Sequence, residues 1–156
     1  MCKLISILMA CLYAILPFGI CRPEPVENAY LLVFQEVITG QKKHGLEFVA
    51  LNLGGAQLDD TTKLEKVIQT YCDELGITIV FLDYEGLREE GYLNEDGILQ
   101  EGIFVFMDND IRLTRRSFIA RAGCFYGPTS GYTATYEVMR IHGKWEIVNT
   151  SNFIIS

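Results

Sequence analysis

The chain has 156 residues, of which 49% are apolar, 21% are charged and 12% are aromatic. This length is typical of one domain, and the apolar fraction is too high for a disordered chain. The formal net charge of −7 argues against a general nucleic-acid binder, which needs a basic surface to neutralise phosphates. We therefore expect a single folded domain that does not bind nucleic acid.

The N-terminus carries an uncharged and mostly apolar run over residues 4–21, with Lys3 before it and Arg22 directly after it. A basic start, an apolar run and a polar exit are typical of a secretory signal peptide. An uncleaved membrane anchor is the alternative, because a run of 18 residues is just long enough to cross about 30 Å of hydrocarbon. A buried helix is a third interpretation. Pro17 interrupts the run and favours cleavage, so we expect an exported protein, periplasmic or secreted, with a leader over residues 1–21 and one domain over residues 22–156.

Cleavage before Arg22 would follow Gly19 and Cys21, which are small residues at the −3 and −1 positions. A lipid on Cys21 is another means of holding the protein at a membrane, although Ile20 stands where the lipoprotein motif has a small residue. We expect contact with a membrane only through an uncleaved leader or a lipidated Cys21.

Of the five cysteines, Cys72 and Cys124 lie outside the leader. In an oxidising compartment they can form one disulfide, which closes a loop of about 50 residues and contributes roughly 3–4 kcal/mol in the chain-entropy model. The alternative is that both are small buried hydrophobic residues. The cysteine spacing fits no zinc motif, so we expect no metal site and no cofactor.

The first half of the domain predicts two amphipathic helices around a strand. The first helix is predicted to begin after Pro25 and to end at Gly40. Its apolar residues recur at helical spacing: Val26, Tyr30, Val33, Phe34, Val37 and Ile38. Residues 47–53 read as a strand that Gly54 and Gly55 break. A second helical pattern follows at Leu64, Val67, Ile68, Tyr71, Cys72 and Leu75, with a capping box formed by Thr62 and Glu65 and a terminating Gly76.

Residues 77–82 form a continuous apolar run, which indicates a strand buried on both faces. The resulting strand–helix–strand unit fits a parallel crossover. Asp83 can cap a short helix that ends at Gly91. Further strands are expected over residues 102–107, 117–122, 131–141 and 144–148, with Asp108, Asn109 and Asp110 as a turn and His142 and Gly143 as a hairpin turn. The fold class is therefore α+β, with N-terminal helices on a mostly antiparallel, curved sheet.

Four segments carry a resemblance to known proteins: FVALNL, DYEGLREEGYL, GILQEGIFVFM and GYTATYEVMRIHGKWEIV. From about residue 47 to residue 148 the chain resembles a group of exported bacterial proteins with no agreed activity. Its last hairpin is also similar to that of nuclear-transport-factor-2-like and cystatin-like folds. The resemblance implies export and an α+β architecture, and it departs from the group where residues 121–124 lack a tryptophan.

The sequence contains no recognisable catalytic motif. His44 follows a helix among lysines and His142 lies in a turn, so we expect both on the surface. Residues 83–101 hold seven carboxylates and one arginine, which is typical of a solvated acidic face. A small enzyme with a cavity remains the alternative, and its polar lining would come from Tyr30, Tyr132, Tyr136 and Glu137.

Four arginines and no acid lie within residues 111–125, in a chain of negative net charge: Arg112, Arg115, Arg116 and Arg121. Clustered guanidinium groups bind carboxylates and phosphates, so these residues are candidates for a site that binds an anionic ligand or an acidic partner. Strand periodicity would place Arg115 and Arg121 on one face and Arg116 on the other. The alternative is that they pair with the acidic residues 83–101.

From these observations we expect a small exported binding protein, with an unidentified protein or anionic ligand as its partner, rather than an enzyme. An inhibitor or immunity-type protein that uses the acidic segment against a basic partner is a further candidate.

Overall fold

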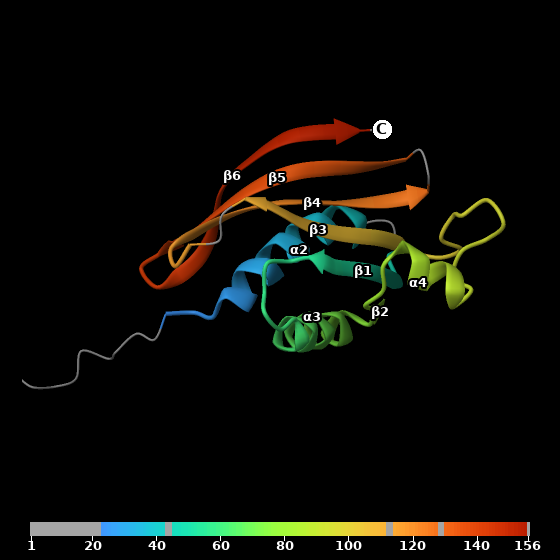
Figure 1. The fold of residues 1–156 in the computed structure, drawn as a ribbon, viewed down its shortest axis with the longest axis horizontal. Helices are drawn as coiled ribbons and strands as arrows, with labels where there is room; N and C mark the ends of the chain where they lie inside the picture. The colour runs from blue at the N-terminus through green and yellow to red at the C-terminus, as the bar shows by residue number, and fades with distance from the viewer. Residues whose placement is uncertain (1–22, 43–44, 112–113, 128–129, 156) are drawn as a thin grey trace, which may run out of the picture.

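The computed structural model describes residues 23–42, 45–111, 114–127 and 130–155, which form one sheet with helices on both of its faces (Figure 1). The expected leader, the lipid site at Cys21, His44 and the candidate site residue Arg112 lie outside the described residues.

The sheet has six strands in the order β2-β1-β3-β4-β5-β6. β1 is parallel to both of its neighbours, and all other neighbouring pairs are antiparallel. This arrangement confirms the predicted α+β class and the strand–helix–strand unit. In chain order the elements are α2 (Val26–Lys42), β1 (Phe48–Gly55), α3 (Thr62–Leu75), β2 (Thr78–Val80), α4 (Tyr84–Glu89), β3 (Ile103–Ile111), β4 (Ser117–Gly127), β5 (Ser130–Ile141) and β6 (Lys144–Ile155).

The two faces of the sheet are covered unequally. α2 and α3 pack on one face, called here the inner face, and enclose the larger core. On β1, Val49, Leu51 and Leu53 point into this core because side chains alternate along a strand. The opposite, outer face carries a smaller core in which Leu87 of α4 packs on Ala50. The outer face is therefore covered mainly at the β2-β1-β3 end (Figure 1).

The helical patterns are confirmed, with changes at the helix ends. Tyr30 and Phe34 of α2 are completely buried, as are Val33, Val37 and Ile38, and the helix continues past Gly40 to Lys42. The predicted capping box is wrong, because the N-cap of α3 is Thr61, whose hydroxyl donates to Glu65 Oε1 at 2.6 Å instead of capping a backbone N–H. The φ of +70° at Gly76 confirms the predicted terminator of α3.

Several strand boundaries differ from the prediction. β4 and β6 are longer than expected, because they run to Gly127 and Ile155 and not to residues 122 and 148. The strand expected over residues 77–82 is reduced to the three residues of β2, because β2 is an edge strand that pairs only with β1. Gly54 and Gly55 belong to β1 and do not break it. The predicted turn at residues 108–110 is wrong: Asp108 lies inside β3, between Gly55 of β1 and Arg121 of β4. Pairing on both sides outweighs the local turn preference of Asp and Asn.

The segment before α2 is tied to the β5–β6 hairpin. Glu24 N–H donates to the Gly143 carbonyl at 3.0 Å, and Glu24 Oε2 accepts from Trp145 N–H at 3.0 Å. Trp145 Nε1 donates to the Pro25 carbonyl at 2.9 Å. The φ values of 51° at His142 and 86° at Gly143 confirm the two-residue hairpin turn. These contacts fix where α2 begins relative to the sheet.

We expect Gly123→Ala to lower the free energy of unfolding by about 2 kcal/mol, measured by urea denaturation. A Cβ at Gly123 of β4 would overlap the carbonyl oxygen of Tyr132 and lie 2.9 Å from Thr133 Cα, and these backbone atoms belong to the β4–β5 ladder. The matched control is Gly40→Ala on α2, where no atom lies within 4 Å of the new Cβ and stability should rise by about 0.5–1 kcal/mol. Equal stability of the two variants would contradict this account of the β4–β5 contact.

Candidate functional site

Of the predicted arginine cluster, the structure describes Arg115, Arg116 and Arg121, and it does not bring these three together. Arg121 lies on β4 and donates from Nη2 to Asp108 Oδ2 of β3 at 3.1 Å, so its partner is not in the acidic segment 83–101 as one interpretation expected. Arg115 and Arg116 precede β4, so the predicted alternation of strand faces does not apply to them, and both are exposed. The cluster therefore separates into a paired arginine on the sheet and two exposed arginines before β4.

The tyrosines proposed to line a catalytic cavity belong instead to the core. Tyr30 and Tyr136 are buried in the larger core. The hydroxyl of Tyr132 donates to the Val37 carbonyl at 2.6 Å. Glu137 alternates with Tyr136 on β5 and so lies on the opposite face of the sheet. These four residues do not form a common lining, and the expectation that they do is wrong.

Cys72 and Cys124 are completely buried, and the disulfide considered between them is not formed in this structure. Cys124 Sγ lies 3.7 Å from Tyr126 Oη. Burial raises the pKa of the Cys124 thiol to about 11 and the pKa of Tyr136 to about 12. At neutral pH these side chains are uncharged, which suits core residues better than nucleophiles.

One pocket lies at the carboxyl ends of the parallel strands β1 and β2, a position where α/β proteins often bind ligands. It has a volume of about 260 Å³, and its polar groups already bond within the protein. Asn52 Oδ1 accepts from Gly54 N–H at 2.8 Å, and Asp83 Oδ1 accepts from Gly86 N–H, also at 2.8 Å. The polar side chains of this pocket are therefore held in place mainly by contacts within the protein.

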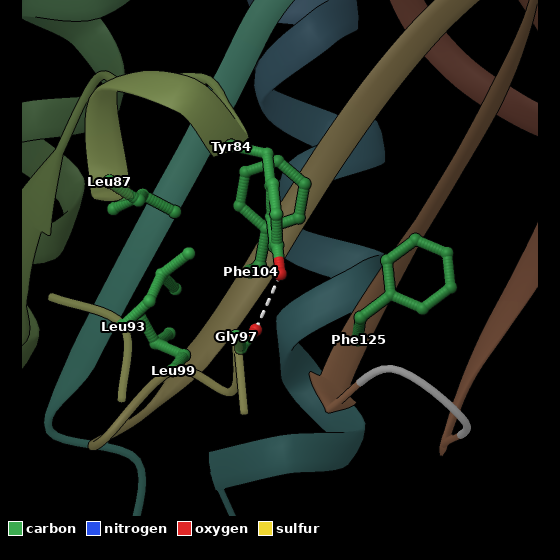
Figure 2. A pocket seen from close by; sticks show the side chains of 7 residues that line it. All are labelled: Tyr84, Leu87, Leu93, Gly97, Leu99, Phe104 and Phe125. Carbon is green, nitrogen blue, oxygen red and sulfur yellow. Dashed lines mark hydrogen bonds between the residues drawn. The ribbon is translucent and has the colours of Figure 1, made fainter. Parts of the chain in front are cut away.

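A groove of about 360 Å³ on the outer face is the best candidate site (Figure 2). α4 contributes Tyr84 and Leu87 on one side, and the loop after α4 contributes Leu93, Gly97 and Leu99. The sheet supplies the floor with two aromatic rings, Phe104 of β3 and Phe125 of β4. The aromatic floor continues along the sheet, because Phe125 stacks on Phe106 with ring centroids 5.3 Å apart.

The loop that forms one wall of the groove is held by its own hydrogen bonds. Asn94 Oδ1 accepts from the N–H groups of Asp96 at 3.0 Å and Ile98 at 2.9 Å, and Leu93 and Leu99 form a β-bridge. The Tyr84 hydroxyl donates to the Gly97 carbonyl at 2.6 Å and joins α4 to the loop (Figure 2). Gly97 has a φ of +74°, and a Cβ there would lie 2.5 Å from that hydroxyl, so glycine is required for this contact. The groove is thus preformed.

The elements that form the groove carry a strong negative charge. Every carboxylate in residues 83–101 is exposed: Asp83, Glu85, Glu89, Glu90, Glu95, Asp96 and Glu101. Arg88, the one cation of this segment, lies over the Tyr84 ring at 5.5 Å. The segment that forms α4 and one wall of the apolar groove is therefore acidic, and its seven exposed carboxylates are called here the acidic rim.

The groove residues were missed from the sequence because each looks like an ordinary core or loop residue. One signal was present: residues 103–107 are apolar at every position, so the outer face of β3 carries Phe104 and Phe106 and requires a cover or a ligand. α4 and its loop cover Phe104 only in part.

Comparisons with protein-family models, curated proteins and solved structures find no match for this chain. Within the described ranges, no three His, Cys, Asp or Glu side chains are grouped as metal ligands. Across the same ranges, no helix has the length and hydropathy needed to cross a membrane.

We expect the stability of the protein to fall between about pH 9 and about pH 11, in part through Cys124. The raised pKa of Cys124 means that the folded state keeps its thiol proton while the unfolded state loses it near the ordinary value of 9.0. This stabilisation is fully present below pH 9.0 and is lost as the pH rises toward the folded pKa of about 11. Denaturation in the presence of a reductant should show a loss of about 2 kcal/mol that is absent in Cys124→Ser. Parallel pH profiles for the two proteins would contradict the assignment.

Proposed function

We propose that this protein is an exported binding protein that captures a basic polypeptide through the groove and its acidic rim. The observation that carries the proposal is a preformed apolar groove on a surface whose carboxylates are all exposed. Protein interfaces commonly combine an apolar centre, in which a few side chains supply most of the affinity, with a polar border. The groove and the rim supply these two parts.

The size and lining of the groove favour insertion of an apolar side chain. Its volume of about 360 Å³ lies near the lower end of ligand sites, which range over about 300–1,000 Å³. Phe104 and Phe125 present aromatic surface to an incoming ring or aliphatic chain. A phenylalanine or leucine side chain of a partner would gain burial there without displacing a hydrogen bond of the protein.

The lining supports binding more than chemistry. Tyr84 is its one ionisable residue, and the Tyr84 hydroxyl is engaged with the Gly97 carbonyl at 2.6 Å. General acid–base catalysis needs a positioned group that can exchange a proton with the substrate. A nuclear-transport-factor-2-like enzyme is less well supported, because Tyr30 and Tyr136 fill the core.

The charge of the rim supports a basic partner. Seven exposed carboxylates against one arginine attract cations over a Debye length of about 8–10 Å. Such a field raises the rate at which a basic partner associates, and it repels acidic partners. Its contribution to the affinity itself is smaller. This is the chemistry expected of an inhibitor or immunity-type protein that covers a basic surface.

We expect a pentapeptide with phenylalanine between pairs of lysines to bind about tenfold more tightly than the same peptide with a central alanine. Phe125→Ser should remove this preference, because it removes one of the two aromatic rings of the groove floor. The control Val148→Ser, at an exposed apolar position on β6, should keep the preference. Fluorescence anisotropy of labelled peptides at low ionic strength measures both effects. Equal affinity for the two peptides in the unchanged protein would refute the groove as an apolar anchor site.

We expect neutralisation of the rim to weaken binding of the lysine-flanked peptide about tenfold and to flatten its salt dependence. The rim variant changes four exposed acids to their amides: Glu89, Glu90, Glu95 and Asp96. A matched variant with the same net charge neutralises four exposed acids elsewhere: Glu36, Asp59, Glu74 and Glu146. If both variants lose affinity equally, the peptide responds to net charge and not to the rim.

For the exported state, we expect the product recovered from a bacterial periplasm or culture medium to have the intact mass of residues 22–156. The physical reason is that the apolar run at residues 4–21 enters the membrane, which leaves the bond between Cys21 and Arg22 accessible for cleavage. Intact-mass spectrometry with and without reductant also reports any lipid on Cys21 and the redox state of Cys72 and Cys124. Recovery of the full-length chain in the soluble cytosolic fraction would contradict export.

A further inference from the structure

A second pocket of about 360 Å³ lies where the start of α2, the segment before β4 and the β5–β6 hairpin meet. Two arginines line it, Arg115 and Arg140, together with Thr114, Val26 and Trp145. No carboxylate is among these lining residues. The pocket therefore combines two positive charges with an indole ring and an aliphatic side chain.

Arg140 is held in place but keeps unused binding capacity. Its guanidinium lies over the Trp145 ring at 4.3 Å, and its Nη2 donates to the Glu24 carbonyl at 2.7 Å. Its Nε is buried and has no hydrogen-bond partner within the described part of the chain. The neighbouring carboxylate of Glu24 accepts from Trp145 N–H, and the ion pair seen in the described ranges is that of Arg121 with Asp108. The charge of Arg140 is thus not neutralised by an ion pair within those ranges.

Arg115 brings a second guanidinium to the same pocket from a different part of the chain. Its side chain is exposed, while the adjacent Thr114 folds the backbone by accepting from Ser117 N–H at 2.9 Å and donating to the Ser117 carbonyl. The segment is also joined to β5, because Arg140 N–H donates to the Arg116 carbonyl at 2.8 Å. These bonds hold the backbone of Arg115 beside Arg140.

We propose that this pocket binds the carboxylate of a small organic anion, with the apolar body of the ligand against Val26 and next to Trp145, whose ring is mostly buried and is covered by the Arg140 guanidinium. Guanidinium groups pair with carboxylates through two parallel hydrogen bonds, and an arginine already stacked on an aromatic ring loses little freedom in doing so. The indole and valine surfaces favour an anion with an apolar body over a fully hydrated inorganic ion. This site is separate from the groove and does not depend on the proposed function.

Trp145 makes the test direct, because it is the only tryptophan of the chain. Titration with benzoate should change the tryptophan fluorescence in a saturable manner, and saturation-transfer NMR should detect the benzoate ring independently of fluorescence. Benzyl alcohol has the ring without the charge, and inorganic phosphate has charge without the ring, so both should bind at least tenfold more weakly. Absence of saturable benzoate binding by both methods, or equal binding of phosphate, would overturn the proposal.

Two variants separate the pocket from general surface charge. Arg115→Gln should weaken benzoate binding about tenfold, because it removes one charge-assisted partner. Arg116→Gln removes the same charge from the next residue, which is exposed and does not line the pocket, and it should leave the affinity unchanged. Circular dichroism should show that both variants stay folded. Equal weakening by the two substitutions would mean that the anion responds only to surface charge, and the proposal would fail.

Discussion

Burial of α2 on the inner face is the constraint on which the rest of the structure depends. Tyr30 of α2 packs on Phe118 of β4 with ring centroids 4.8 Å apart, and Phe118 in turn meets Trp145 of β6 at 6.4 Å. On its other side, Phe34 of α2 meets Tyr71 of α3 at 6.4 Å. α2 therefore joins the antiparallel strands β4–β6 to the parallel β1–α3–β2 unit. Two strands with one helix have too little core to be stable alone, so the β1–α3–β2 unit is not expected to fold without α2.

The same packing leaves the outer face short of cover, and this imbalance creates the candidate site. α2 and α3 close the inner face, but only the six residues of α4 and the loop that follows it lie over Phe104. Phe106 and Phe125 pair with each other yet remain partly exposed. The exposed aromatic surface at Phe104, Phe106 and Phe125 would lose contact with water when a partner binds, and this makes the aromatic floor of the groove the best candidate site in the described ranges.

The spacing of apolar residues along the sequence predicts most helices and strands of this protein, because each element must bury one face in the core. The stripe at Tyr30, Val33 and Phe34, the short helix capped by Asp83 and the hairpin at His142 could all be derived from residue order. The length of β3 could not, because Asp108 is held by pairing with strands that are distant in sequence. The groove and the Arg115–Arg140 pocket each combine residues from segments far apart along the chain, and no local pattern reports such convergence.

Separation of charge along the sheet explains why Arg115 and Arg140 form no ion pair with the acidic segment in the described ranges. β4 begins at Ser117, two residues after Arg115, and Phe125 in the groove lies eight residues further along the strand. At about 3.3 Å per residue, the start of β4 and Phe125 in the groove lie roughly 26 Å apart along this strand, about three Debye lengths at physiological salt. The two charged surfaces cannot neutralise each other in the folded chain. Each remains available to a ligand of opposite sign, so an acidic protein can carry one surface for cations and another for a carboxylate.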